Sequence, residues 1–446
     1  MSVRAIVLAA GKGTRMKSRT PKVLHELCGR PMLWYSLRAL RDAGIDDVVV
    51  VTNEELQRRI GEFGVRGVVQ SEQLGTGHAV KIALEALAPI AGGRVVVAYG
   101  DMPLLPPGIF RSILDALHNG EAAAMSLVTV KMPLPSNFGR IVRGPGGVER
   151  IVEARDASAA ELSIDEMNAG TYAFDEALLR EAVAGFKNDN AQKEYYLTDA
   201  VAHFVGRGKP VKPVLVDNHL HTLGINDRVE LALARREMNE RLCAQYMREG
   251  VTIVDPSTTY LEPELEIGRD TVIYPNTQIS LLSKIGEQCV IGPNTRLSAA
   301  TIGDRVEVRE SVVSHSAVGN DSFVGPYAHI RSHATLAGEN RIGNFVEIKN
   351  SQLGIGVKAS HLAYLGDASI GEGTNIGAGT ITCNWDGKSK NRTTIGKNAF
   401  IGTNTSIVAP RTIGDGALTG AGSVVTKDVP PGGRVAGNPA KPLPEK

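Results

Sequence analysis

The sequence has few cysteines, and their spacing suits neither a metal site nor a disulfide framework. Four cysteines occur in 446 residues, with no Cys-x-x-Cys pair among them: Cys28, Cys243, Cys289 and Cys383. Structural zinc sites and disulfide scaffolds need closely spaced pairs. We therefore expect four isolated buried thiols.

Charge of one sign and long apolar runs are also missing. The formal net charge is +1, so bulk electrostatics indicates neither a nucleic-acid nor a membrane partner. No apolar stretch approaches the ~18 residues that span a bilayer. The apolar run 3–10 leads directly into a glycine loop with Lys12 and Arg15, where a signal peptide would have its cleavage region. These features predict a cytoplasmic protein.

Residues 1–225 alternate apolar strands with helical patterns. The runs 3–9, 48–52 and 95–99 are expected strands, and helical spacing covers 32–43 and 77–87. Such alternation predicts an α/β domain with a parallel sheet and right-handed crossovers. Because 446 residues exceed one ordinary core, a further domain is expected.

Residues 226–249 contain neither glycine nor proline, and their apolar residues recur at roughly helical spacing. This pattern predicts one long helix, which we interpret as a linker over 226–250 between two domains. The alternative is an ordinary surface helix of the first domain.

From residue 267 onward the sequence repeats. Ile or Val followed by Gly occurs at 13 positions, and seven of the 12 intervals are multiples of six: 267, 285, 291, 302, 318, 324, 342, 355, 370, 376, 395, 401 and 413. A hexad fits one strand and one turn of a three-sided coil, with the aliphatic residue inward and the small residue allowing the backbone to turn. Each coil buries its apolar edge only by stacking on its neighbours.

This pattern resembles the hexapeptide-repeat acyltransferases. The resemblance implies a left-handed parallel β-helix over residues 251–446. It also implies a homotrimer with acyl-CoA sites between neighbouring prisms.

The segment 8–16, Leu-Ala-Ala-Gly-Lys-Gly-Thr-Arg-Met, follows the first expected strand, and Pro21-Lys22 comes shortly after it. Glycines leave backbone N–H groups free to face phosphates, while Lys and Arg supply positive charge for a triphosphate. The segment is not a dinucleotide-binding fingerprint, because Met16 stands where the third glycine should be. The full string resembles the sugar-1-phosphate nucleotidylyltransferases, which have a Rossmann-like α/β fold.

Further segments match this family in order, including Gln73-Leu74-Gly75-Thr76-Gly77-His78, which resembles a base-recognition loop. The resemblance assigns catalysis to Arg15 and Lys22 and binding of UTP or UDP-N-acetylglucosamine to these positions: Leu8, Ala9, Ala10, Gly11, Lys22, Gln70, Gly75, Thr76, Tyr99, Gly100, Asp101, Gly139, Glu153, Asn168 and Asn226. Among them, Gly139, Glu153 and Asn168 resemble the family's sugar-binding positions.

Asp101 follows an expected strand, where α/β sheets place their ligands. A carboxylate there suits Mg²⁺, which prefers oxygen ligands, and the family pattern adds Asn226 as the second protein ligand. The sugar-1-phosphate oxygen then attacks the α-phosphorus, and pyrophosphate leaves. Since the nucleophile is already anionic, positioning and charge neutralisation are expected to carry the rate.

The repeat region holds more polar residues than a β-helix needs, and a polar loop up to Thr394 interrupts its hexads. His361 is the natural general base, because imidazole titrates near working pH. Either Asp367 or a backbone carbonyl is expected to orient its ring.

At the polar segments 360–367, 373–379 and 382–387 the chain resembles a bacterial family of bifunctional enzymes. These enzymes acetylate glucosamine-1-phosphate with acetyl-CoA and then transfer a uridylyl group to the product. The resemblance makes His361 the base. It assigns glucosamine-1-phosphate binding to Arg331, Lys349, Tyr364 and Asn375. It assigns acetyl-CoA binding to Ala378, Asn384, Trp385, Thr403 and Ala421.

Two alternatives stay open. The chain could be a UDP- or dTDP-sugar pyrophosphorylase whose β-helix only assembles the oligomer, although a scaffold needs neither His361 nor the Asn384–Trp385 loop. It could instead be a non-enzymatic regulatory subunit, which would be expected to have lost Arg15, Lys22 or Asp101; all three are present.

Overall fold

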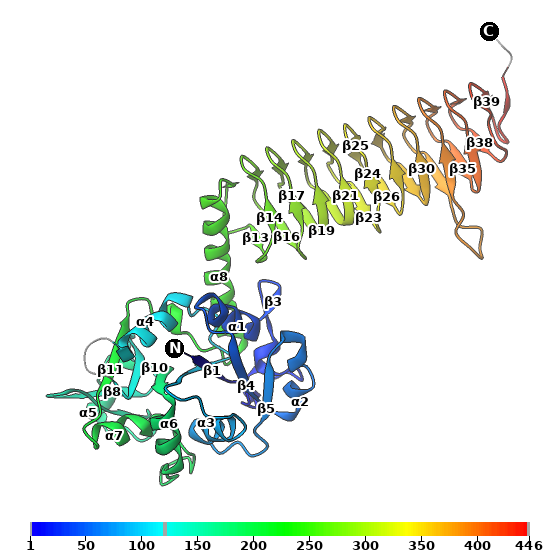
Figure 1. Ribbon diagram of the computed structural model, residues 1–446. Helices are drawn as coiled ribbons and strands as arrows, with labels where there is room; N and C mark the ends of the chain where they lie inside the picture. Colours follow the sequence, from blue (N-terminus) through cyan, green and yellow to red (C-terminus); the bar gives the residue numbers. More distant parts are fainter. Residues whose placement is uncertain (1, 119–122, 444–446) are drawn as a thin grey trace. The chain divides into compact units, whose positions relative to one another are not determined.

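The computed structural model describes residues 2–118 and 123–443 (Figure 1). The chain divides into two compact units, Met1–Met238 and Asn239–Lys446. The helix expected over 226–249 is α8, Arg228–Arg248, and the division falls within it.

The first unit is built on a nine-stranded sheet with the order β11-β7-β10-β6-β1-β4-β5, to which the hairpin β8–β9 is attached. Its strands are β1 (Val3–Leu8), β4 (Asp47–Thr52), β5 (Arg66–Val69), β6 (Arg94–Tyr99), β7 (Met125–Lys131), β8 (Arg140–Gly144), β9 (Gly147–Val152), β10 (Glu166–Asp175) and β11 (Val211–Val216); β2 (Glu26–Leu27) and β3 (Arg30–Pro31) form a separate hairpin.

The sheet is mixed, so the expectation of a parallel sheet is only partly right. Strands β5, β4, β1 and β6 are parallel, whereas β10 runs antiparallel to both β6 and β7. A parallel return needs a crossover of a dozen or more residues, usually a helix. The hairpin β8–β9 and the four-residue α5 (Ala159–Leu162) precede β10 instead, and the chain re-enters the sheet in the opposite direction.

Helices cover both faces of this sheet. Strand residues alternate between two cores: Val7, for example, packs with residues of α1 and α4, and its neighbour Ile6 packs with residues of α3, α6 and α7. The helices are α1 (Met32–Asp42), α2 (Glu54–Gln57), α3 (Thr76–Glu85), α4 (Pro107–His118), α6 (Glu176–Ala184) and α7 (Asp199–Val205), with short 3₁₀ turns η1 (Thr14–Met16), η2 (Lys22–Leu24), η3 (Ile60–Phe63) and η4 (His219–Thr222). The expected α/β layering is confirmed.

The second unit is a three-sided stack of coils with parallel strands, as Figure 1 shows. The first face comprises β12 (Thr252–Ile253), β15 (Val272–Ile273), β18 (Val290–Ile291), β20 (Glu307–Val308), β22 (Phe323–Val324), β25 (Arg341–Asn344), β28 (Lys358–His361), β31 (Asn375–Ile376), β34 (Phe400–Ile401), β37 (Leu418–Thr419) and β39 (Arg434–Ala436), closed by the antiparallel β40 (Lys441–Pro442).

The other two faces share β19 (Arg296–Ile302) and β21 (Val312–Val318), which bend around the corner between them. The second face adds β13 (Tyr260–Leu261), β16 (Gln278–Ser280), β23 (His329–Arg331), β26 (Glu347–Lys349), β29 (Tyr364–Gly366), β32 (Ile381–Cys383), β35 (Ser406–Val408) and β38 (Val424–Val425). The third adds β14 (Glu266–Ile267), β17 (Lys284–Ile285), β24 (Thr335–Leu336), β27 (Gln352–Leu353), β30 (Ala368–Ile370), β33 (Thr393–Ile395) and β36 (Arg411–Ile413). The coil length and three faces agree with the predicted left-handed β-helix.

At most of the Ile/Val-Gly pairs the glycine has a different role from the one predicted; Gly292, Gly325 and Gly356 are exceptions, because their positive φ angles are those of turn residues. A Cβ on Gly377 would lie 2.6 Å from backbone atoms of Gly402, and one on Gly371 would lie 2.5 Å from Gly396, each on the next coil. The glycine therefore allows close stacking between coils. The turns themselves use other residues with left-handed backbone angles, such as Gln288, Arg305 and Asp321.

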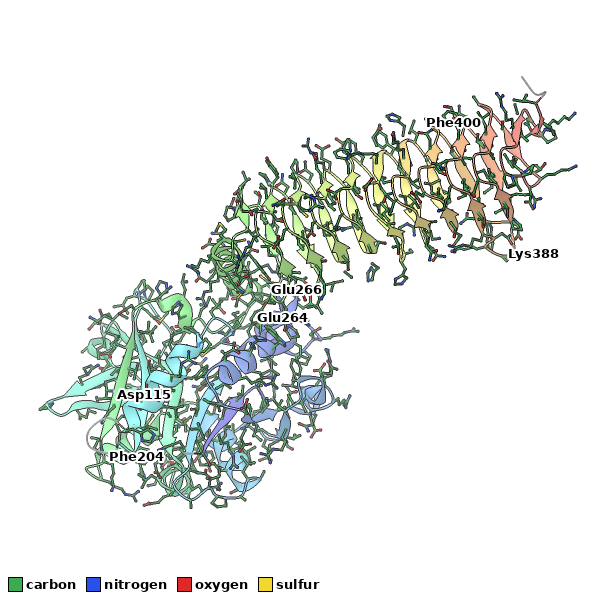
Figure 2. All side chains as sticks on the ribbon, turned by 45° about the horizontal axis from the view of Figure 1, so that its top comes forward. Asp115, Phe204, Glu264, Glu266, Lys388 and Phe400 are labelled. Carbon is green, nitrogen blue, oxygen red and sulfur yellow. The ribbon has the colours of Figure 1, made fainter. Side chains whose placement is uncertain are left out.

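One insertion breaks the regular coil length. Asn375 pairs with Phe400, 25 residues further on, whereas Phe400 pairs with Leu418, 18 residues further on. The extra residues form the polar loop between β32 and β33, which carries Lys388 and projects from the prism (Figure 2).

The first coil has no preceding coil to pair with, and side chains of α8 make hydrogen bonds to its backbone groups. Asn239 donates from Nδ2 to the Thr259 carbonyl (2.8 Å) and accepts at Oδ1 from the Leu261 amide (3.1 Å). The Tyr246 hydroxyl likewise donates to the Glu262 carbonyl and accepts from the Leu265 amide. These side chains make the bonds that a preceding strand would make, so the helix closes an edge that would otherwise invite pairing with another chain.

We predict that Asn239→Ala lowers the free energy of unfolding of the β-helix by about 2–4 kcal/mol. The substitution leaves a buried carbonyl and a buried amide unpaired, and each such group costs about 1–3 kcal/mol. Urea unfolding followed by circular dichroism measures the change. Gln245→Ala on the same helix, which removes only an exposed bond to Glu249, is the control; equal losses in both variants would contradict the capping role.

Candidate active sites

A pocket of about 280 Å³ lies at the carboxyl ends of the strands in the first unit. Strands β1 and β6 are adjacent there, with Leu8 in register with Tyr99. After β1 the chain forms β4 and then β5 on one side of it, and it then forms β6 on the other side. Ligands of α/β sheets bind at such switch points.

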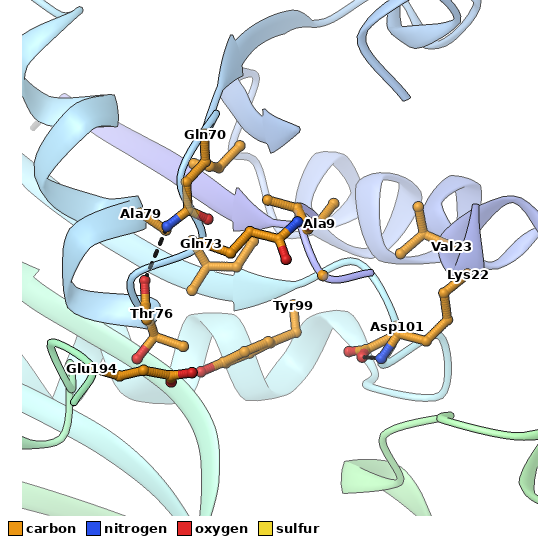
Figure 3. A pocket seen from close by; sticks show the side chains of 15 residues that line it. Ala9, Lys22, Val23, Gln70, Gln73, Thr76, Ala79, Tyr99, Asp101 and Glu194 are labelled. Atoms are coloured by element: carbon orange, nitrogen blue, oxygen red, sulfur yellow. Dashed lines mark hydrogen bonds and ion pairs between the residues drawn. The ribbon is translucent and has the colours of Figure 1, made fainter. Parts of the chain in front are cut away.

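Most of the predicted nucleotide-binding residues line this pocket: Leu8, Ala9, Ala10, Gly11, Lys22, Gln70, Gly75, Thr76, Tyr99 and Asp101 (Figure 3). Gly100, which was also predicted, lies in the chain between Tyr99 and Asp101. Five further residues line the pocket: Gln73, which belongs to the predicted base-recognition loop, and Val23, Val51, Ala79 and Glu194, which were not predicted as binding residues.

The loop over 70–76 is held rigidly on one side of the pocket. The buried Gln70 donates from Nε2 to the Gly75 carbonyl (3.1 Å), and Gln73 donates to the Ala10 carbonyl (2.6 Å). Gly75 has φ +104°, and a Cβ on it would lie 2.6 Å from the Tyr195 carbonyl oxygen. These contacts fix the conformation of the loop on this side of the pocket.

Lys22, Asp101 and Asn226 meet on the opposite side of the pocket. The Lys22 ammonium donates to the Asp101 carboxylate and to the Asn226 carboxamide oxygen (3.0 Å), and Figure 3 shows Lys22 and Asp101 pointing toward each other. The side-chain oxygens of the two predicted metal ligands, Asp101 and Asn226, thus converge on one point, where the Lys22 ammonium lies.

The glycine loop shapes this cluster. Gly13 has φ +58°, and a Cβ on it would lie 2.7 Å from the Cβ of Lys22, so only glycine allows the loop to close on that lysine. Gly11 has open space around it. Arg15 lies in η1 with an exposed side chain and is not among the residues that line the pocket.

The predicted sugar residues Gly139, Glu153 and Asn168 lie close together next to Tyr99. The Asn168 amide donates to the Gly139 carbonyl (2.8 Å), and a Cβ on Gly139 would lie 3.5 Å from the Glu153 carboxylate. A bulge in β10 between Asn168 and Tyr172 turns this strand, as bulges beside active sites often do.

Burial dominates the electrostatics of this side of the pocket. It raises the pKa of the Tyr99 hydroxyl, and the carboxylates of Glu153 and Asp101 raise it further. Burial also raises the pKa of Glu153, against the effect of a hydrogen bond from the Thr198 hydroxyl (3.2 Å). Thr198 and Glu194 come from a segment with no periodic signal, which is why sequence reasoning missed them.

His361 lies at the end of β28 with an exposed ring, and Asn344 orients it. The Asn344 carboxamide oxygen is 2.7 Å from His361 Nδ1. Because that oxygen only accepts, Nδ1 carries a proton, and in the neutral ring Nε2 therefore keeps its lone pair. The expectation that Asp367 or a backbone carbonyl orients the ring is therefore wrong.

Asp367 instead organises the start of the polar loop. Its buried carboxylate accepts from the side-chain amides of Asn350 and Asn384, each at 2.5 Å. Asn384 also donates to the Tyr364 hydroxyl (3.4 Å). Asn384, a predicted acetyl-CoA residue, thus bonds both to this carboxylate and to Tyr364, a predicted glucosamine-1-phosphate residue.

Four predicted residues stand one above another on successive coils. The register of the first face places them at equivalent positions: His361, Ala378, Thr403 and Ala421. Backbone bonds from Asn404 to Ala378 and from Gly422 to Thr403 run along the column. Since coils are about 4.8 Å apart, the column is an extended track that begins at the histidine.

A group of cations lies on the second face. Arg331 and Lys349 are in register on β23 and β26, and Arg331 pairs with Glu347. Lys390 of the polar loop, which sequence reasoning missed, lies near Lys349 and lowers the pKa of its ammonium. Two neighbouring ammonium groups favour a bound anion.

Not all predicted β-helix residues meet within one chain. Tyr364 shares the second face with Arg331 and Lys349, whereas Asn375 lies on the first face beside Lys358. Trp385 bridges to Lys390 in the loop and is 59% exposed.

Two features are absent from residues 2–118 and 123–443. No group of three or more His, Cys, Asp or Glu residues there is arranged to hold a metal ion. No helix in that part of the chain is both long and apolar enough to cross a membrane.

Comparison with known proteins matches both units. Residues 5–158 match the MobA-like NTP transferase domain, and residues 392–427 match the bacterial transferase hexapeptide repeats. The bifunctional protein GlmU of Shouchella clausii is 44% identical over 430 residues, covering 96% of this chain and 94% of the relative. Those of Trichlorobacter lovleyi and Mycolicibacterium gilvum are each 46% identical over 96% of this chain, and cover 94% and 88% of the relative. With this identity over nearly its whole length, the chain belongs to the family of bifunctional GlmU proteins.

Proposed function

We propose that the chain catalyses two steps of UDP-N-acetylglucosamine synthesis. It transfers an acetyl group from acetyl-CoA to glucosamine-1-phosphate, and then a uridylyl group from UTP to N-acetylglucosamine-1-phosphate. We assign uridylyl transfer to residues 1–225 and acetyl transfer to residues 251–446. The observation that favours a second enzyme over a scaffold is the Asn344–His361 pair, because a β-helix needs no oriented base.

In uridylyl transfer, the loop over 70–76 holds the base and the Gly139, Glu153 and Asn168 group holds the sugar. The sugar-phosphate oxygen attacks the α-phosphorus of UTP, and pyrophosphate leaves. Lys22, with Arg15 from the exposed turn η1, offsets phosphate charge. The residues mainly position two anions against each other in a partly buried site.

Asp101 and Asn226 suit a magnesium ion. Both present oxygen atoms, which this hard ion prefers, and both oxygens already converge on the Lys22 ammonium. Bound there, Mg²⁺ would neutralise charge on the phosphates. Because the protein offers only two ligands, phosphate oxygens and water would supply the others.

In acetyl transfer, the cations Arg331, Lys349 and Lys390 bind the phosphate of glucosamine-1-phosphate. His361 Nε2 takes a proton from the amino group of glucosamine-1-phosphate, while the nitrogen of that amino group forms a bond to the acetyl carbonyl carbon. The bond from that carbon to sulfur then breaks, and coenzyme A leaves as the thiol with a proton returned by the imidazolium. Acetyl-CoA would lie along the column from His361 to Ala421.

The division of sugar residues between two faces supports a site shared by neighbouring chains, and hence the homotrimer. We also propose a cytoplasmic location, where these nucleotide and coenzyme A substrates are made. Sedimentation equilibrium of the full chain tests the trimer.

His361→Ala is expected to lower release of coenzyme A from acetyl-CoA plus glucosamine-1-phosphate by about 10²–10⁴-fold, the usual contribution of a general base. Pyrophosphate release from UTP plus N-acetylglucosamine-1-phosphate in the same preparation should stay unchanged. A wild type that releases pyrophosphate but never coenzyme A would show that the β-helix is only a scaffold.

Asn344→Ala should lower coenzyme A release by about 10²-fold, because a base turned away from its substrate loses its reactive geometry. Asn344→Asp keeps an acceptor for Nδ1–H and should retain most of the activity. Equal losses in both variants would argue that the carboxamide does more than orient the ring.

Asp101→Ala is expected to lower pyrophosphate release by about 10²-fold or more at saturating Mg²⁺, since it removes charge stabilisation from a partly buried site. Asp115→Ala, an exposed change on α4, is the control. Removing divalent ions with EDTA should stop pyrophosphate release and leave coenzyme A release intact. Wild-type turnover in Asp101→Ala would exclude this metal site.

A further inference from the structure

Arg140 in β8 is a buried cation whose role the reaction has not explained. Its side chain is 1% exposed, and no carboxylate among the described residues lies within ion-pair distance of it. Its guanidinium donates to the carbonyls of Phe138, Ser136 (2.7 Å) and, more weakly, Leu162 (3.5 Å). Its Nε has no partner in the described residues.

A buried charge without a counterion is unfavourable. An apolar side chain of similar size would fill the same space without this cost, so packing alone does not account for an arginine here. What the guanidinium provides is a planar fork of donors that reaches several carbonyls at once. Its position indicates that those carbonyls are what must be held.

The carbonyls belong to two segments that are next to the predicted sugar residues in the chain. Ser136 and Phe138 form the loop that ends at Gly139. Leu162 ends α5, which lies in the chain between Glu153 and Asn168. Arg140 thus connects both segments to β8. Arg140 is also in register with Met167 of β10, next to Asn168.

We propose that Arg140 is a positioning residue for the sugar phosphate in uridylyl transfer. It does not touch the substrate; it fixes the loop 136–139 and α5 so that Gly139, Glu153 and Asn168 face one space. The inference rests on the proposed function of these three residues. It predicts a selective effect on the sugar substrate, because the base loop over 70–76 and the Lys22 cluster make no bond to Arg140.

The same strand offers a matched control. Arg143 lies three residues further along β8 and makes a two-bond ion pair with Glu166 (2.7 Å each), in which the arginine is exposed and the glutamate is buried. The paired variants are Arg140→Lys with Arg143→Lys, and Arg140→Met with Arg143→Met. Lysine keeps the charge but loses the planar fork, so Arg140→Lys isolates the clamp from the charge.

The experiment measures kcat and both KM values for pyrophosphate release in the full chain, with hydrogen exchange of peptides covering 134–139 and 159–163. In Arg140→Lys we expect the KM for N-acetylglucosamine-1-phosphate to rise at least tenfold, the KM for UTP to change less than twofold, and both peptides to exchange faster. The Arg143 variants should match the wild type. Unchanged exchange of peptides covering β1 and β6 reports that the first unit of each variant is folded.

An unchanged sugar-phosphate KM in Arg140→Lys would overturn the proposal, as would an equal rise in both KM values, which indicates a merely structural role. If Arg140→Met does not fold, the lysine pair alone decides. If the wild type releases no pyrophosphate from these substrates, the proposed function fails, and unchanged exchange of both peptides would then separately reject the clamp.

Discussion

The hydrogen-bond register between successive coils is the constraint on which the second unit depends. It places residues from separate hexads directly above one another, so a chemical property repeated along the sequence becomes a column in space. Glycines such as Gly377 exist because the next coil passes too close for a Cβ. The same register stacks Asn344 beside His361 and lines up Ala378, Thr403 and Ala421 beyond it. It also creates a free edge at the first coil, which Asn239 and Tyr246 close.

The first unit depends on a different constraint, which is the fixed conformation of the loops at the edge of its sheet. Glycines with left-handed backbone angles do this where a side chain would collide. Gly13 allows the phosphate loop to close on Lys22, and Gly75 fits against the Tyr195 carbonyl. Gly170 does the same in the β10 bulge, where a Cβ would lie 3.0 Å from the Tyr99 ring. Each glycine fixes the place of a predicted binding residue, so the loop geometry is part of the site.

Periodic features could be predicted from the sequence, and features that depend on partners distant in the chain could not. The strand at 48–52 and the helix at 77–87 are local patterns, and both exist close to their expected bounds as β4 and α3. The direction of β10 could not be predicted, because it depends on the connection before it. Asn344 was missed because its contact with His361 follows from the coil register and not from spacing in the sequence.

The two sites prepare for anionic substrates in opposite ways. In the first unit, Lys22 is already paired with Asp101 and Asn226, so a substrate phosphate competes with internal partners. In the β-helix, Lys349 and Lys390 lie near each other, and their repulsion lowers the pKa of Lys349. A phosphate placed between them would relieve that repulsion and favour the charged form of both. The first arrangement suits a site that also needs a metal ion to balance several phosphates, and the second suits a single phosphate held by side chains alone.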